Sequence, residues 1–511
     1  ARSSPVTSWP KGLRPNSGGS GLRMSQFIGK TRPVDTKPAA ADTFSGVSRL
    51  RQPKYLASPS HTSHAAGRPP RRGRSRYAGR LLFVMTETVP ALYRGNFMGN
   101  AGGRDNGERP ISGLRVLDFS RVLTGPHATR MLCDLGAEVI KLEPPEGDLT
   151  RFTNPRVNSL STYFVQQNVG KKNICLDLSK PEAVALVHRL IEHVDIVVEN
   201  FRPGVMKRMH LDYDTLSAIN PRLIYASITG YGNTGPWVHR RAYAPVVGAE
   251  TGITKYQGDA RGGDYANDPF SHADVYTAME TCTAILAAVI QRGRTGRGQW
   301  IDVAMAQTML YVNEHAHDAL WTEPVPPEQI RSFQPANYPV LTAANGDKVV
   351  VSGHPAERGT FDNFMNGADR GDVIGDPRFV DVPSRLAHLD EIQRILREWA
   401  ATMPDATAIE EALARYQLAS GKIRSPREVA DTEWGRERNV TVEVSDRGDG
   451  TVRIPNAPWR FSDADTTTTG EPRYPGEDND GVFSELLGLA PSDLASLAEG
   501  GILLSRKPRP R

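Results

Sequence analysis

The stretch GLRVLDFSRVLTGPHATRMLCDLGAEVIKLE (113–143) decides the fold class. Within it, LRVLDFS (114–120) is an apolar run of strand length, and PHATRMLCDLG (126–136) has the spacing of a helix that ends at a glycine. EVIKLE (138–143) is a second run of strand length. A strand, a helix and another strand in about 30 residues form a βαβ unit with parallel strands. The stretch therefore predicts an α/β fold with a parallel sheet.

The same alternation continues along the chain. NICLDLS (173–179) predicts a strand, and a helix follows from about Pro181, with proline in its first turn. DIVVENF (195–201) and RLIYASITG (222–230) predict two further strands. A doubly wound, Rossmann-like sheet follows from this alternation.

A long helix is predicted from about Asp274 to Gln291, ending at Gly293, and QWIDVAMA (299–306) predicts a strand after it. No stretch of the sequence approaches the roughly 18 apolar residues that we expect of a membrane-spanning helix. We therefore predict a protein that does not enter a membrane.

The pattern changes after about Gln334. ANGDKVVVSG (344–353) predicts a β-turn between strands, and HLDEIQRILREWAATM (388–403) predicts an amphipathic helix. These segments indicate a smaller α+β domain. The chain then closes with a predicted helical tail over 482–503.

Length and charge limit the classes of function. The 511 residues predict two domains plus tails, and 39% hydrophobic against 23% charged residues predicts a soluble protein. The net charge is +4, but residues 1–84 hold 16 Lys or Arg against Asp35 and Asp42, so the remainder carries −10. An acidic body argues against a nucleic-acid partner.

The basic N-terminal segment has no hydrophobic periodicity and is rich in Arg, Ser, Pro and Gly, which predicts disorder. It has the composition of an organelle transit peptide, but we favour Met85 as the true start, with an upstream extension. Cys133, Cys175 and Cys282 lie far apart, which fits a reducing, cytoplasmic compartment. The twelve histidines show no ligand spacing, so no metal is predicted.

From Ile111 to about Leu503 the chain resembles the class III CoA-transferases, the superfamily of formyl-CoA transferase, carnitine dehydratase and α-methylacyl-CoA racemase. The motifs that carry the resemblance lie in the family's order: 113–148, LDLSKPEA (176–183), VVENFRPGVMKRM (197–209), RLIYASITGYGNTGP (222–236), SHADVYTAM (271–279), TGRGQWIDVAM (295–305) and LLGLAPSDLASLAEGGI (486–502). Each motif alone is weak, and together they are specific.

The resemblance implies a fold, an assembly and a domain division. Each chain would form a ring from a large Rossmann-like domain and a small domain, and two rings would interlock as a homodimer with active sites between the chains. We expect an N-terminal extension and linker over 1–110 and the large CoA-binding domain over 111–330. The small α+β domain would cover 331–440, and a C-terminal segment over 441–511 would return to the large domain.

The resemblance also implies that CoA moves from an acyl-CoA to a free carboxylic acid through a covalent aspartate, with no permanently bound cofactor. Asp274 in SHADVYTAM is the candidate nucleophile. Its place at the start of the predicted long helix supports this role, because free N–H groups and the helix dipole favour an ionised carboxylate there. The alternative is that Asp274 is only a helix N-cap.

By the same resemblance, the residues at the family's CoA contacts are Leu176, Asn200, Phe201, Arg208 and Arg241. Amide and cationic groups suit the phosphates and adenine of CoA, and Phe201 offers a ring for stacking. Arg208 and Arg241 could instead be solvated surface charges. Lys180 is one position away from a family lysine, which leaves its role in doubt.

One departure concerns proton chemistry. A family acidic residue is replaced by Ala244, directly after Tyr243. The racemase branch uses a His-Asp pair in this stretch to exchange a proton beside the thioester. Tyr243 and Ala244 are unsuitable as bases near neutral pH, so a racemase is the second hypothesis.

Two other hypotheses remain. GYGNTG (230–235) fits a dinucleotide-binding fingerprint, but Pro236 and Trp237 follow at once and no helix is predicted there, so NAD chemistry is disfavoured. A CoA-thioester-binding protein without turnover is suggested by Ala244 and by the lack of an evident glycine-rich lid. The presence of Asp274 speaks against that hypothesis.

Overall fold

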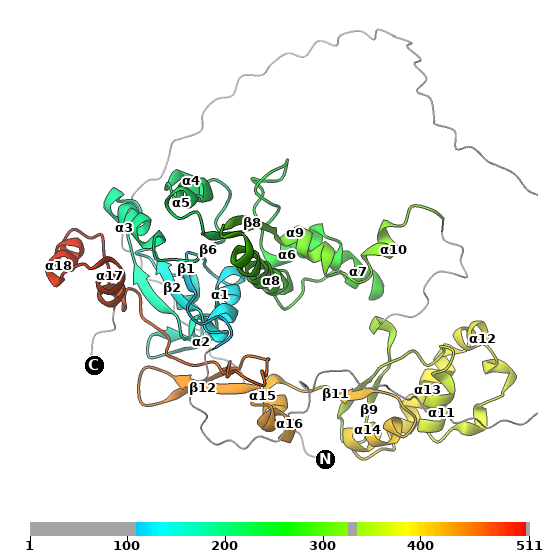
Figure 1. The fold of residues 1–511 in the computed structure, drawn as a ribbon. Helices are drawn as coiled ribbons and strands as arrows, with labels where there is room; N and C mark the ends of the chain where they lie inside the picture. Colours follow the sequence, from blue (N-terminus) through cyan, green and yellow to red (C-terminus); the bar gives the residue numbers. More distant parts are fainter. Residues whose placement is uncertain (1–108, 325–334, 507–511) are drawn as a thin grey trace, which may run out of the picture. The chain divides into compact units, whose positions relative to one another are not determined.

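The computed structural model describes residues 109–324 and 335–506 (Figure 1). The expectations for the N-terminal extension, including Met85, lie outside these residues. A six-stranded parallel sheet dominates, in the order β5-β2-β1-β6-β7-β8. Its strands are β1 (Arg115–Asp118), β2 (Glu138–Glu143), β5 (Lys172–Cys175), β6 (Ile196–Glu199), β7 (Ile224–Thr229) and β8 (Gln299–Ala304). The predicted α/β fold with a parallel sheet is confirmed.

The strand order creates a switch point in the sheet. The chain starts at β1, moves outward through β2 to β5, and returns to place β6 on the other side of β1. The loops after β1 and β6 therefore leave the sheet in opposite directions. Open α/β sheets bind their ligands at such a point, outside the carboxyl ends of the strands.

Helices cover both faces of the sheet (Figure 1). Alternate strand residues point to opposite faces, so Leu117 packs with α3 (Pro181–Ile191), α17 (Asn479–Leu487) and α18 (Pro491–Glu499). On the other face, Val116 packs with α1 (Thr124–Asp134) and α8 (His272–Thr295). The shorter helices of this part are α2 (Thr162–Asn168), α4 (Val205–Arg208), α5 (Tyr213–Ile219), α6 (Ala244–Glu250), α7 (Ile253–Ala260), α9 (Met305–Tyr311) and α10 (Ala316–Leu320).

A second hydrophobic core lies in the segment 340–418. Antiparallel strands β9 (Val340–Thr342), β10 (Lys348–Val351) and β11 (Ser420–Lys422) pack there with α11 (Phe361–Gly367), α13 (Leu389–Ala400) and α14 (Ala406–Ala414). Outside that core lie α12 (Val382–Ala387), α15 (Pro426–Ala430), α16 (Glu433–Glu437) and two hairpins, β3 (Arg156–Val157) with β4 (Leu160–Ser161) and β12 (Thr441–Ser445) with β13 (Thr451–Pro455). The predicted strands and helix of this part are present, and the domain limits remain a prediction.

Several predicted helix ends need correction. The long helix begins at His272 and ends at Thr295, where Gly296 adopts φ of 72°. Gly293 does not end it, because a glycine inside a helix only weakens it. The predicted C-terminal helix is two helices, since Gly488 has φ of 66° and Pro491 starts α18.

The expectation about apolar length also needs correction. Within the described residues α8 is long and apolar enough, by length and composition alone, to cross a membrane. A core helix of a globular domain passes the same test, and α8 buries Cys282, Ile285 and Ala288 against the sheet. Its buried face also carries Arg292, which pairs with Asp195 at 3.0 Å.

The segment 230–243, all of it described, contains no helix, and the next helix is α6. The dinucleotide fingerprint at 230–235 therefore lacks the helix N-terminus that would bind a pyrophosphate.

Candidate active site

The turn between β1 and α1 lies at the switch point and has an unusual backbone. Val122 has φ of 69°, a conformation that is costly for a β-branched residue. The side chain of Asn200, just after β6, makes two hydrogen bonds to the backbone of this turn. Its Oδ1 accepts from the Arg121 N–H at 2.8 Å, and its Nδ2 donates to the Arg121 carbonyl at 2.8 Å. Strained backbone of this kind persists only where the surroundings fix it, and it gathers at functional sites.

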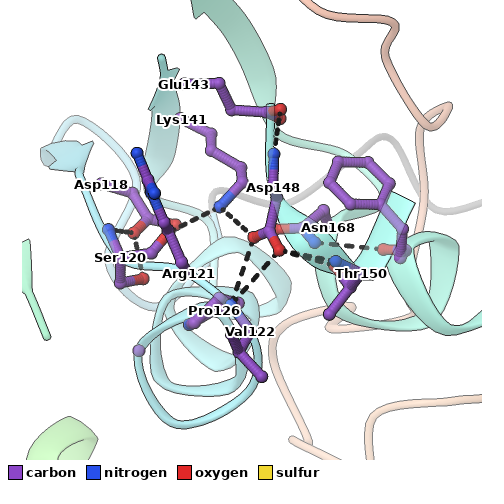
Figure 2. Close-up of polar contacts among 12 residues, drawn as sticks. Asp118, Ser120, Arg121, Val122, Pro126, Lys141, Glu143, Asp148, Thr150 and Asn168 are labelled. Carbon is purple, nitrogen blue, oxygen red and sulfur yellow. Dashed lines mark hydrogen bonds and ion pairs between the residues drawn. The ribbon is translucent and has the colours of Figure 1, made fainter. Parts of the chain in front are cut away.

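A buried ion pair, Lys141 with Asp148, also contacts this turn (Figure 2). Lys141 Nζ lies 3.2 Å from Asp148 Oδ2 and donates to the Ser120 carbonyl at 2.7 Å. The Val122 N–H lies 3.3 Å from both carboxylate oxygens of Asp148. Burial alone would raise the pKa of Asp148, but the Lys141 charge and hydrogen bonds from Thr150 lower it overall. Asp148 is thus an ionised acceptor for the strained N–H.

Two more buried ion pairs surround this one. Lys171 Nζ bonds to Asp118 Oδ2 at 3.1 Å and to three other oxygen acceptors at 2.7 to 2.9 Å. Arg151 and Glu143 form the third pair, at 2.6 Å. Burial lowers the pKa of Lys171 to about 8, and its four acceptors suit the ammonium form. These charges are all paired, as burial requires.

Asp274 meets the β1–α1 turn across the chain. It is the third residue of α8, and its Oδ1 accepts a hydrogen bond from the hydroxyl of Thr124, the first residue of α1. The N-cap position belongs to Ser271, so the N-cap alternative for Asp274 is wrong. Burial raises the pKa of Asp274, and the Thr124 bond opposes that rise only in part. Burial therefore leaves the carboxyl less readily ionised than the argument from the helix start predicted.

Tyr163 of α2 lies within electrostatic range of the same carboxylate. Burial and the negative charges of Asp274 and Asp148 raise the pKa of its phenol to about 12. Thr124, Val122 and Tyr163 were not identified from the sequence. The sequence signal for this turn is the glycine and proline of TGP (124–126), because these residue types are common in turns.

The predicted CoA contacts lie at different depths. Asn200 and Phe201 follow β6 at the switch point, and the Arg121 guanidinium lies 5.4 Å from the centre of the Phe201 ring. Arg208 ends α4 and Arg241 precedes α6, and both side chains are exposed. Leu176 is fully buried, in a bridge with Leu503, so in this structure it is not open to a ligand.

The doubtful residues now have physical explanations. Lys180 Nζ donates to the Gly500 carbonyl at 2.5 Å, which gives it a structural contact at the end of α18. Ala244 is buried in a small apolar cluster that includes Ala273, the neighbour of Asp274. A carboxylate at position 244 would need a buried partner, and alanine avoids that cost. Tyr243 is 66% exposed.

Glu199, at the end of β6, gives a pH-dependent prediction. Burial raises the pKa of its carboxyl to about 7, although hydrogen bonds from Ser227 and the Phe201 N–H oppose the rise. The folded state therefore binds more protons than the unfolded state between roughly pH 4.5 and 7, and this group's contribution to stability falls as pH rises through that window. We expect Glu199→Gln to remove that loss.

The test is urea unfolding of both proteins at pH 5 and pH 8. From pH 5 to pH 8, the free energy of unfolding of Glu199→Gln should rise by about 1–3 kcal/mol relative to that of the wild type. An equal pH dependence in the two proteins would show that Glu199 ionises normally.

Comparison with known proteins supports a family assignment. The model of CoA-transferase family III matches residues 111–479, more than half of the chain. This chain belongs to CoA-transferase family III. The resemblance to the class III CoA-transferases is therefore confirmed.

Curated relatives of the family III chain act on different acids. A succinate–glutarate CoA-transferase of Agrobacterium fabrum is 35% identical over 359 residues, 68% of this chain and 88% of the relative. An acetyl-CoA:oxalate CoA-transferase of Acetobacter aceti is 33% identical and covers 75% and 93%. A formyl-CoA:oxalate CoA-transferase of Streptomyces coelicolor is 32% identical and covers 77% and 99%.

A solved structure agrees with the fold. The crystal structure of a CAIB/BAIF family protein from Brucella suis superposes with a TM-score of 0.65 at 32% identity, covering 75% of this chain and all of the other. The class III CoA-transferase fold is therefore confirmed.

Proposed function

We propose that the protein transfers CoA from an acyl-CoA to a free carboxylic acid through covalent intermediates at Asp274. The carboxylate attacks the thioester carbonyl, the C–S bond breaks, and a mixed anhydride and CoA thiolate form. The thiolate then attacks the Asp274 carbonyl carbon, releasing the donor acid and leaving an aspartyl-CoA thioester. The acceptor acid reverses both steps.

One observation carries the proposal: Asp274 is a partly buried carboxylate with a single hydrogen-bond donor among the residues that the structure describes, beside a strained turn at the switch point of the sheet. Partial desolvation makes a carboxylate a stronger nucleophile, since water no longer stabilises its charge. Asn200 and Phe201 lie on the neighbouring loop, where CoA would approach, and Arg208 and Arg241 supply charge for its phosphates.

Activity is tested with a panel of donors and acceptors. Succinyl-, acetyl- and formyl-CoA are each mixed with oxalate, glutarate, malate or a fatty acid, and the acyl-CoA products are separated by chromatography. At least one acceptor should become a CoA thioester. If instead deuterium enters the α-carbon of a 2-methylacyl-CoA without any acceptor, the protein is a racemase, and tight CoA binding with neither reaction would indicate a binding protein.

We also propose that the protein works as a homodimer, as the resemblance implies. The outward side of α8 carries an exposed stripe at helical spacing, formed by Tyr276, Met279, Thr283, Ala287 and Ile290. Ile290 is 66% exposed and Met279 49%. All of these residues except Thr283 are apolar or aromatic; exposed apolar side chains grouped on one helix face favour an interaction site, and a second copy is the partner that symmetry provides most simply.

Met279→Glu should therefore shift the protein from dimer to monomer in sedimentation equilibrium, because a charge would be buried in the contact. Met279→Leu, which keeps the apolar surface, should remain dimeric. A wild-type protein that sediments as a monomer at micromolar concentration contradicts the proposed assembly.

We place the protein in a reducing, cytoplasmic compartment. All three cysteines are free thiols. Burial raises the pKa of Cys133 to about 11 and the pKa values of Cys175 and Cys282 to about 12, so none is a thiolate near neutral pH.

A further inference from the structure

We propose that the Thr124 hydroxyl is a catalytic hydrogen-bond donor, which stabilises negative charge on the Asp274 carbonyl oxygen whenever that carbonyl is attacked. The inference rests on the proposed function, because it assigns a role within the covalent steps at Asp274. It adds a reacting-centre contact that comes from α1, which lies far from Asp274 in the sequence.

The two oxygens of Asp274 have different surroundings. Oδ1 accepts the hydrogen bond of Thr124, and the residues at 109–324 and 335–506 provide no hydrogen bond to Oδ2. A lone pair that is not engaged in a hydrogen bond is the better nucleophile. Oδ2 therefore attacks the donor thioester and becomes the bridging oxygen of the anhydride, and Oδ1 becomes the carbonyl oxygen.

The chemistry of the next step then falls on Oδ1. When CoA thiolate attacks the Asp274 carbonyl carbon, the new C–S bond forms and the C=O electron pair moves to Oδ1. The oxyanion collapses, the bond from carbon to Oδ2 breaks, and the donor acid leaves as a carboxylate with that electron pair. No proton is gained or lost, so a fixed donor at Oδ1 is sufficient to stabilise the charge.

Thr124 is held where such a donor has to be. The Thr124 residue is 3% exposed. It follows the turn whose backbone is hydrogen-bonded by two side chains, Asn200 at Arg121 and Asp148 at Val122. Glycine follows it at position 125, where an added Cβ would lie 2.1 Å from Ser120 Cβ, so the turn is closely packed. A donor fixed before the reaction pays no reorganisation cost during it.

Thr124→Val removes the hydroxyl at nearly constant shape, and Thr124→Ser retains it. Each protein is mixed with donor acyl-CoA, and the reaction is stopped with acid at times from milliseconds to seconds. The mass of the intact protein is then measured by mass spectrometry. The acyl adduct and the CoA adduct differ in mass. In Thr124→Val the CoA adduct should form about 10²–10³-fold more slowly, with acyl adduct accumulating, and Thr124→Ser should remain within about tenfold of wild type.

A merely structural role would not produce this split between adducts. CoA affinity, measured by calorimetry, should change less than about threefold in both variants, and Thr124→Ala provides a second protein without the hydroxyl should the valine variant not fold. A CoA adduct formed at the wild-type rate in Thr124→Val or Thr124→Ala overturns the inference. A wild-type protein that transfers CoA without any adduct at Asp274 contradicts the proposed function itself, and this inference with it.

Discussion

Asp274→Asn is expected to lower the rate of CoA transfer by about 10⁴-fold or more, as removal of a covalent nucleophile does in other enzymes. The amide is close in shape to the carboxylate, and its oxygen can still accept the Thr124 hydrogen bond. It is a poor nucleophile toward a thioester, because the amide carries no negative charge and its nitrogen lone pair is delocalised into the carbonyl group. CoA binding should therefore be retained while turnover is lost.

The measurement is the steady-state rate of acyl-CoA product formation, together with CoA affinity by calorimetry. Asp259→Asn is the matched control, since Asp259 is an exposed residue of α7 that pairs with Lys255 at 2.5 Å. The control should keep its rate within about twofold. If Asp274→Asn retains a tenth of the wild-type rate, the carboxylate is not the nucleophile.

Lys141→Met is expected to reduce the free energy of unfolding by about 3–5 kcal/mol, which is the usual cost of leaving one partner of a buried ion pair uncompensated. Lys141 and Asp148 have side-chain exposures of 1% and 0%. Without the ammonium group, the Asp148 carboxylate and the Ser120 carbonyl each lose a donor. The strained turn at Val122 is then less firmly held, because Lys141 no longer bonds to the Ser120 carbonyl or pairs with Asp148.

Urea unfolding at pH 7, followed by far-UV circular dichroism, measures the change. Lys172→Met offers a close comparison, because Lys172 is 36% exposed and pairs with Glu138 on the surface. That variant should lose about 1 kcal/mol or less. Equal losses in the two variants would mean that burial of the Lys141 pair adds nothing.

The strands could be predicted because each one is marked by a short run of apolar residues that is visible in the sequence itself. Val116, Leu117 and Ile140 stand in short apolar runs, and both faces of a parallel strand are buried, so the run itself is the signal. Helix ends were less accurate. Gly293 was predicted to end the long helix. The helix ends instead at Gly296, where the backbone adopts the positive φ that favours glycine.

The details of the site depend on contacts that a sequence does not contain. Thr124 and Asp274 lie 150 positions apart and meet only because α1 and α8 pack on the same face of the sheet. Lys141 and Asp148 are residue types that are normally exposed, and their burial follows from their pairing. Asn200 was expected at the site from the resemblance alone, and its two hydrogen bonds to the Arg121 backbone could not be predicted, because they depend on the switch-point geometry.

The central claim is that Asp274 carries CoA covalently during transfer. Wild-type protein is incubated with a donor acyl-CoA, trapped in acid, digested and sequenced by mass spectrometry. The account predicts CoA on the peptide that contains SHADVYTAM (271–279), attached at Asp274. CoA found on another side chain, or rapid transfer to an acceptor while that peptide stays unmodified, would contradict it.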